Sequence, residues 1–226
     1  MNKIIVEMSD KRVTAIPVLE SNEKLFDVHV SSLSYGKPPE SPETAPYYRL
    51  LREGVISKLE RAQSNLSKGF SFRLYEGYRN PEFQKKLFKE QLIRTTKLNP
   101  IWGEVKCYKE ASKLASPLKT FDGTLITPPH STGGALDIEI VDINGKVIDF
   151  GMETKDWFNV DPQLCESYVS NLGDEAKENR EMLISTLESE GFVNYPREWW
   201  HFSYGDQYWA FNKNKPNAIY DRIELD

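Results

Sequence analysis

Four side chains have the types and spacing that metal-assisted hydrolysis requires. His130 and Asp137 are the first and last residues of the run HSTGGALD, in which paired glycines let the backbone turn tightly. Glu198 and His201 lie in the aromatic run EWWHF. Two histidines and one carboxylate suit a catalytic zinc ion, because three protein ligands leave the fourth position for water, whose pKa then falls to roughly 7. A further carboxylate that does not bind the metal can take the water proton, so all the parts of a hydrolytic site are present.

Asp137 has an unusual setting for a carboxylate. It lies early in an apolar segment, beside Leu136 and Ile138. A carboxylate is costly to bury there unless it is paired or bound to a metal. The alternative interpretation is structural, with His130 as a loop histidine and His201 in an aromatic cluster, bonded to a backbone carbonyl. Short motifs of this kind leave both interpretations open.

Glu198 and His201 can act together only under a geometric condition. Residues three apart in a strand point to opposite faces of the sheet. The two side chains therefore converge only if the chain bends between them, or if Glu198 precedes the strand. Pro196, just upstream, favours such an irregular start.

Three segments taken together resemble the VanX-like D-alanyl-D-alanine dipeptidases. They are HxxGxAxD over residues 130–137, ExxH over 198–201, and EGYR over 76–79, where the family has Asp-Gly-Tyr-Arg. The resemblance runs from about Leu51 to Tyr204. This family belongs to a wider group of zinc peptidases that also contains D,D-carboxypeptidases and the hedgehog signalling domain.

The resemblance implies a role for each of these polar side chains. His130, Asp137 and His201 would bind one zinc ion per chain, and Glu198 would be the catalytic base. Arg79 would stabilise the oxyanion that forms when water attacks the peptide carbonyl. A fixed guanidinium aimed at developing negative charge is worth several kcal/mol in a dry site, so this role is physically sensible.

The family also uses an aspartate to hold the free amino group of the substrate. Asp156 lies at a suitable distance after Asp137, and we expect it to bind this ammonium group. The residues around it depart from the family pattern, because Gly-Met-Glu-Thr over 151–154 replaces the usual Met-Gly-Thr. Asp161 and Glu153 are therefore alternatives for the same role.

The elements around these segments predict an α+β fold, with helices packed on a mainly antiparallel sheet as in the hedgehog and D,D-peptidase group. Apolar periodicity and capping residues predict helices over 51–66 (ended by Gly69), from Asn80-Pro81 to about 97, over 104–114, and from Asp174 to Gly191. Alternating apolar residues predict strands over 70–74, 135–141 and 198–204. Turns at Asn144-Gly145 and Gly205-Asp206 predict that 146–150 and 208–211 return as hairpin partners.

Length and composition favour one domain, residues 1–226, with a loop-rich N-terminal extension to about residue 46. The net charge of −5, with scattered lysines and arginines, argues against a nucleic-acid partner. Two cysteines exclude a disulfide-dense scaffold. No apolar run approaches the roughly 20 residues that cross a membrane, and the apolar stretch at the start of the chain is too short for a signal peptide. We therefore expect a cytoplasmic protein, or a periplasmic or secreted one if a leader precedes this sequence. The sequence gives no indication of the oligomeric state.

Three functions fit the resemblance. The first is zinc-dependent hydrolysis of the D-Ala-D-Ala dipeptide to two D-alanines, which would recycle cell-wall fragments or deplete a precursor of peptidoglycan. The second is a zinc D,D-carboxypeptidase or endopeptidase that acts on longer peptidoglycan peptides. The segment from Ile101 to Thr127 could build a closed pocket for the first or an open groove for the second. The third is a zinc-bearing binding module without catalysis, which we rank last because Glu198 and Arg79 are both present.

Overall fold

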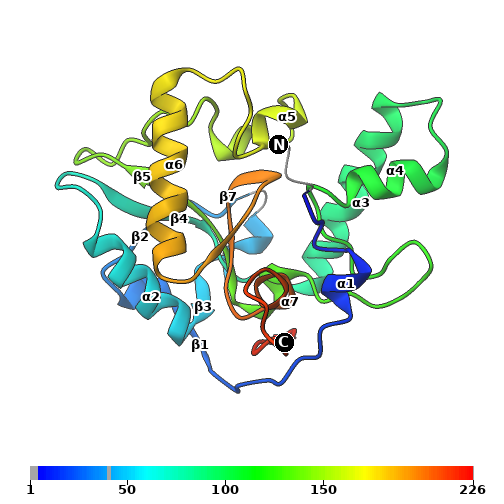
Figure 1. Ribbon diagram of the computed structural model, residues 1–226, viewed down its shortest axis with the longest axis horizontal. Coiled ribbons are helices and arrows are strands. Elements are labelled where there is room, and N and C mark those ends of the chain that lie inside the picture. Colours follow the sequence, from blue (N-terminus) through cyan, green and yellow to red (C-terminus); the bar gives the residue numbers. More distant parts are fainter. Residues whose placement is uncertain (1–4, 40–41, 226) are drawn as a thin grey trace.

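The computed structural model describes residues 5–39 and 42–225 and has a mixed α+β architecture around a five-stranded sheet (Figure 1). The strand order is β2-β4-β5-β7-β6. These strands are β2 (Ser34–Tyr35), β4 (Ser71–Glu76), β5 (Ala135–Val141), β7 (Glu198–Ser203) and β6 (Val193–Tyr195). β2 and β4 pair in parallel and the other neighbours are antiparallel, so the expected α+β fold with an antiparallel-rich sheet is confirmed.

Helices lie on both sides of this sheet. α2 (Glu53–Ser64) and α6 (Asp174–Ser189) lie on one side, and α3 (Pro81–Leu98) with α4 (Glu104–Ala111) on the other (Figure 1). The shorter helices are α1 (Lys11–Thr14), α5 (Pro162–Cys165) and α7 (Gln207–Asn212), and the 3₁₀ turns are η1 (Val28–Val30), η2 (Pro42–Thr44), η3 (Pro129–Thr132) and η4 (Thr154–Asp156). In the described ranges, no helix has both the length and the apolar character needed to cross a membrane.

Apolar side chains alternate along the strands and fill the core between the sheet and α2 and α6. Leu74 of β4 lies opposite Ile138 of β5, and Leu136 of β5 lies opposite Phe202 of β7. All four belong to the main hydrophobic core and are fully buried. Because successive strand residues point to opposite faces, Asp137 points to the face away from this core.

The sequence pattern located β5 and α3 closely. β5 covers the predicted residues 135–141, and α3 begins at Pro81, with Asn80 Oδ1 accepting a hydrogen bond from Glu82 N at 2.9 Å. α2 ends earlier than predicted, at Ser64. Gly69, with φ +94°, therefore belongs to the turn before β4 and does not cap the helix.

Of the two predicted hairpin partners, residues 146–150 are confirmed in part and residues 208–211 are wrong. Residues 146–150 return beside β5, but they form a single bridge between Val141 and Val147 and no strand. Residues 208–211 lie in α7, because Asp206 Oδ1 accepts a hydrogen bond from Trp209 N at 2.8 Å and caps a helix there. β7 pairs instead with β6, a strand that the sequence pattern did not predict.

The N-terminal part of the chain, to about residue 46, carries short elements that join the rest of the fold. A second, two-stranded sheet pairs β1 (Leu25–Asp27) with β3 (Leu50–Arg52). The buried Arg52 guanidinium binds Glu20 at 3.0 Å and the carbonyl oxygen of Thr132 at 2.8 Å. The extension is therefore tied directly to η3, the turn that carries His130.

Candidate metal and catalytic site

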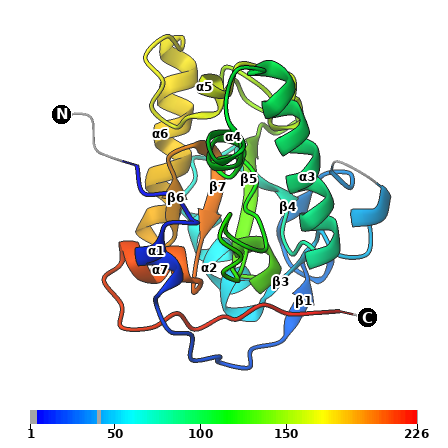
Figure 2. The same cartoon turned by 90° about the vertical axis from the view of Figure 1, so that its right-hand side faces the viewer.

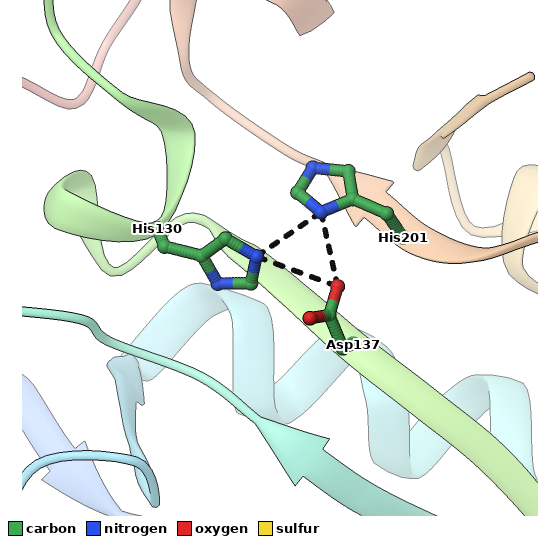
Figure 3. A group of neighbouring side chains, drawn as sticks. All are labelled: His130, Asp137 and His201. Carbon is green, nitrogen blue, oxygen red and sulfur yellow. Dashed lines mark hydrogen bonds and ion pairs between the residues drawn. The ribbon is translucent and has the colours of Figure 1, made fainter. Parts of the chain in front are cut away.

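Three possible ligand atoms converge on one point (Figure 3). His130 Nε2 lies 3.1 Å from His201 Nδ1, and Asp137 Oδ1 lies 3.0 Å from His201 Nδ1 and 3.4 Å from His130 Nε2. All three residues are buried. Tetrahedral zinc, with ligands at about 2.0–2.1 Å, holds its ligand atoms about 3.3 Å apart. The three predicted ligands therefore have the spacing that one zinc ion requires.

The sheet itself places two of these ligands. Asp137 of β5 lies directly opposite His201 of β7 in the antiparallel register. On the other side of β5, a register shift between Leu74 and Glu76 brings Glu76 of β4 opposite Asp137. Glu76, Asp137 and His201 thus form a row across three adjacent strands, on the face away from the core.

His130 reaches this row from η3, just before β5. The chain turns back through Gly133, which has φ +71°, and through Gly134, where a Cβ would lie 2.2 Å from the carbonyl oxygen of Tyr204. His130 Nδ1 donates to the carbonyl oxygen of Gly77 at 2.7 Å. This bond fixes the ring and leaves the lone pair on Nε2, the nitrogen that faces Asp137 and His201.

The protonation states of Asp137 and His201 suit a metal ion. Burial alone would raise the pKa of Asp137, but the adjacent His130 and His201 lower it below its usual value. Burial lowers the pKa of His201 to about 4, so its imidazole is neutral at pH 7. An ionised carboxylate and neutral imidazoles are the forms that bind zinc.

Glu198 lies beside the three ligands rather than among them. Its Oε2 is 3.8 Å from His201 Nδ1. Burial, together with the negative charge of Asp137, raises the pKa of Glu198 well above its usual value. A raised pKa makes a carboxylate a stronger base than a free one, which suits a group that must accept a proton and return it.

A β-bulge brings Glu198 and His201 to the same side. In the β6–β7 register, Tyr195 lies opposite Glu198, while the preceding Asn194 lies opposite Phe202. The residues of β7 between those two positions, His201 among them, lie opposite no residue of β6 in the strand register. The chain therefore bends between Glu198 and His201, which is one of the two conditions that the sequence set for their convergence.

Asn194 holds this bulge together. Its side-chain Nδ2 lies 3.2, 3.4 and 3.0 Å from the carbonyl oxygens of Glu198, Trp199 and His201. Its Oδ1 accepts a hydrogen bond from Ser167 Oγ at 2.6 Å. No chemical motif marks this residue in the sequence, although a lone amide in the apolar segment GFVNY is a signal for such a buried contact.

Arg79 lies at the other edge of the same cluster. It forms a buried ion pair with Glu76 and donates from Nη1 to Gln84 Oε1 at 2.8 Å. Its Nη2 is 3.9 Å from Asp137 Oδ2. Glu76, which replaces the aspartate of the family motif, therefore keeps the guanidinium in place beside the proposed metal ligands.

A partly enclosed cavity opens onto this cluster. Its lining includes Arg79, Glu198 and the three proposed ligands. Thr154 and Trp157 add a second wall, and Thr154 Oγ1 is buried without a hydrogen-bond partner among the described residues.

The candidate ammonium ligands are not brought to this cavity. Asp156 ends η4, between Thr154 and Trp157, but it is not among the lining residues. Glu153 pairs with Lys155 on the surface, and Asp161 caps α5. Binding of the substrate's amino group by Asp156 therefore stays a prediction.

Comparison with known proteins adds a family to this geometry. A family model described as D-ala-D-ala dipeptidase matches residues 46–221. A D-alanyl-D-alanine dipeptidase of Synechocystis sp. (strain ATCC 27184 / PCC 6803 / Kazusa) is 27% identical over 240 residues, which cover 95% of this chain and 97% of that protein. The D-alanyl-D-alanine dipeptidase of Escherichia coli (strain K12) is 32% identical over 73 residues, 32% of this chain and 36% of that protein.

Two solved structures are more distant. The LD-carboxypeptidase LdcB aligns with a TM-score of 0.46 and 14% identity, over 87% of this chain and 76% of its own. The D,D-pentapeptidase VanY of a VanB-type resistance cassette, solved with Zn(II), aligns with a TM-score of 0.46 and 12% identity, over 90% of this chain and 96% of its own.

Proposed function

This chain belongs to the D-Ala-D-Ala dipeptidase family and is therefore a peptidase, and we propose that it hydrolyses the D-Ala-D-Ala dipeptide to two D-alanines with one bound zinc ion. The proposal is carried by one observation. His130, Asp137 and His201 offer three ligand atoms at the spacing of a zinc site, and a carboxyl group with a raised pKa lies beside them.

Each polar side chain of the cluster has a task in this reaction. Zinc held by His130, Asp137 and His201 would supply a Lewis acid that polarises the peptide carbonyl and makes water acidic near neutral pH. Glu198 takes a proton from the attacking water and returns it to the amine that leaves when the peptide C–N bond breaks. The Arg79 guanidinium stabilises the negative charge that develops on the carbonyl oxygen.

A zinc carboxypeptidase that acts on longer peptidoglycan peptides is the second candidate. It is favoured by the lining of the cavity, where Asp137 and Glu198 are the only carboxylates among the described residues. Both have tasks already, whereas a dipeptidase needs a further group to bind the free amino group of its substrate. Glu198 and Arg79 favour either enzyme over a zinc-bearing module without catalysis.

The two enzymes separate on a pair of substrates. A dipeptidase discriminates between D-Ala-D-Ala and N-acetyl-D-Ala-D-Ala on the order of 10³-fold or more in kcat/KM, since a site built around a polar group rejects analogues that lack it. Comparable values for the free and acetylated dipeptides would favour the carboxypeptidase. Asp156→Asn tests the ammonium site, because it should weaken the discrimination and leave the zinc in place.

A cytoplasmic location is part of this proposal. The free dipeptide is a small precursor that a cytoplasmic enzyme would meet directly. Fractionation of cells that make the protein from its natural gene, followed by detection with an antibody, decides the point. Recovery in a periplasmic or secreted fraction would contradict it.

A further inference from the structure

A residue from the N-terminal extension lies in the wall of the cavity. Met8 lines it together with Glu198, His201 and Tyr195. The ring centroid of Tyr195 is 6.1 Å from that of His201, and Tyr195 and Met8 belong to the same buried apolar cluster. The extension therefore reaches the cavity beside Tyr195, whose ring is the neighbour of a proposed zinc ligand.

The neighbouring Glu7 fixes this part of the extension to the site. Its Oε2 accepts a hydrogen bond from Tyr195 OH at 2.5 Å. Its Oε1 accepts from Arg197 Nε and Nη2, at 3.2 and 3.0 Å, and Arg197 also pairs with Glu166 at 2.5 Å. Charge-assisted hydrogen bonds to a guanidinium are directional and strong, so Glu7 holds Met8 at a defined depth.

A second anchor lies on the other side of Met8. α1 packs against α7 (Figure 2). Val13 of α1 is buried in the same apolar cluster as Trp209 of α7. Gln207 Nε2 donates to the carbonyl oxygens of Thr14 and Ile16, at 3.0 and 2.6 Å. With anchors before and after it, Met8 forms a fixed wall of the cavity.

We propose that this N-terminal wall, Glu7 and Met8, limits the length of the peptide that the site accepts. The inference rests on the proposed peptidase function and adds to it the residues that set substrate length. An extended peptide grows by roughly 3.3–3.6 Å for each added residue, so a longer substrate needs depth that a fixed wall denies. The extension is thus part of the substrate site, although it lies outside the three motif segments.

The test compares substrates within each variant. Met8→Ala opens the wall, and Val18→Ala is the matched control, because Val18 packs against the same cluster but neither lines the cavity nor belongs to an anchor. The substrates are D-Ala-D-Ala, L-Lys-D-Ala-D-Ala and D-Ala-D-Ala-D-Ala. Met8→Ala should raise kcat/KM for one of the tripeptides relative to the dipeptide about tenfold or more, the lower end of the range that small changes in an apolar pocket produce. Val18→Ala should leave both ratios unchanged.

A second variant keeps the test decisive if Met8→Ala does not fold. Glu7→Gln keeps the side-chain shape but removes the charge that Arg197 binds, so it should move the same ratio in the same direction by a smaller factor. The ratios are internal to each preparation and do not depend on the folded or zinc-loaded fraction. Tm shifts produced by saturating dipeptide or tripeptide, measured in a Glu198→Gln background, report binding without turnover.

The possible outcomes keep the two proposals apart. Unchanged ratios in both Met8→Ala and Glu7→Gln, by turnover and by Tm shift, overturn the N-terminal wall and leave the peptidase function standing. A wild-type protein that accepts both tripeptides as readily as the dipeptide also overturns it. Absence of turnover on every substrate contradicts the proposed function, and the wall is then decided by the Tm shifts alone.

Discussion

Asp137 uses its two carboxylate oxygens differently. Oδ1 faces the two histidine nitrogens, and Oδ2 lies 3.9 Å from the guanidinium of Arg79. One residue thereby connects the proposed metal ligands with the proposed oxyanion donor. Its negative charge also helps to raise the pKa of Glu198. The chemistry of the site thus depends on Asp137. Its oxygens lie close to the other two proposed ligands and to Arg79, and its charge changes the pKa of Glu198.

Replacement of Glu198 separates metal binding from proton transfer. We expect Glu198→Gln to keep its zinc and to lose about 10²–10⁴-fold in kcat, the usual contribution of a positioned acid–base group. Elemental analysis and steady-state kinetics on the same preparation measure both quantities. Turnover close to that of the wild type would show that another residue is the base.

The same variant gives a pH-dependent signature in the metal-free protein. Because the folded-state pKa of Glu198 is raised above its usual 4.5, the folded chain keeps a proton that the unfolded chain loses. The contribution of this proton to the free energy of unfolding is complete below pH 4.5, and it is lost as the pH rises toward the folded-state pKa. Metal-free Glu198→Gln should therefore gain stability over the wild type from pH 4.5 upward. Denaturation midpoints after chelation measure the difference, and parallel profiles from pH 4 to pH 8 would contradict it.

At the scale of elements, bulges in two strands build the site. One turns Glu76 toward Asp137, and the other brings Glu198 and His201 together. An extra residue in one strand changes which side chains share a face, so a regular sheet can present groups that strict alternation would separate. The apolar core on the opposite face keeps its alternation and holds the register.

The amide of Asn194 should control the second bulge. Asn194→Leu removes the donors to three carbonyl oxygens, and we expect kcat to fall roughly 10–100-fold, the usual effect of losing a residue that supports a metal site, with KM little changed. Ser167→Ala, which leaves those donors in place, is the matched control and should lose much less. A lower Tm with unchanged kcat per zinc-loaded enzyme would show that Asn194 only stabilises the fold.

Patterns within one segment were readable from the sequence, and relations between segments were not. The apolar alternation of β5 and the Asn80-Pro81 start of α3 are local signals, and both elements were predicted closely. The aromatic run 208–211 fits either a strand or a helix, and Asp206 was taken for a turn residue rather than a helix cap. The proposed zinc ligands were found because their chemistry is distinctive. Asn194 and Met8 were missed because their importance lies in contacts with distant residues.

At the scale of the whole molecule, the zinc site should stabilise the fold. A ligand that binds only the folded state at a thousand times its Kd adds about 4 kcal/mol, which for a chain of this size raises Tm by roughly 8–16 °C. Chelation should therefore lower the Tm of the zinc-loaded protein by about that amount. His201→Ala loses a ligand, so it should lack both zinc and activity, and its Tm should not respond to the chelator. Equal Tm values for the wild type with and without chelator would contradict a structural contribution of the metal.

The order of the strands also governs how the protein forms on the ribosome. β7 lies inside the sheet, between β5 and β6, although both β6 and β7 come from the last part of the sequence. While the intervening residues are being made, which takes on the order of seconds, β5 has an unpaired edge that can recruit strands from other chains. His201 arrives with β7, so the set of proposed zinc ligands is completed when the sheet closes. A nascent chain therefore lacks one proposed ligand and leaves one edge of β5 unpaired until that strand emerges.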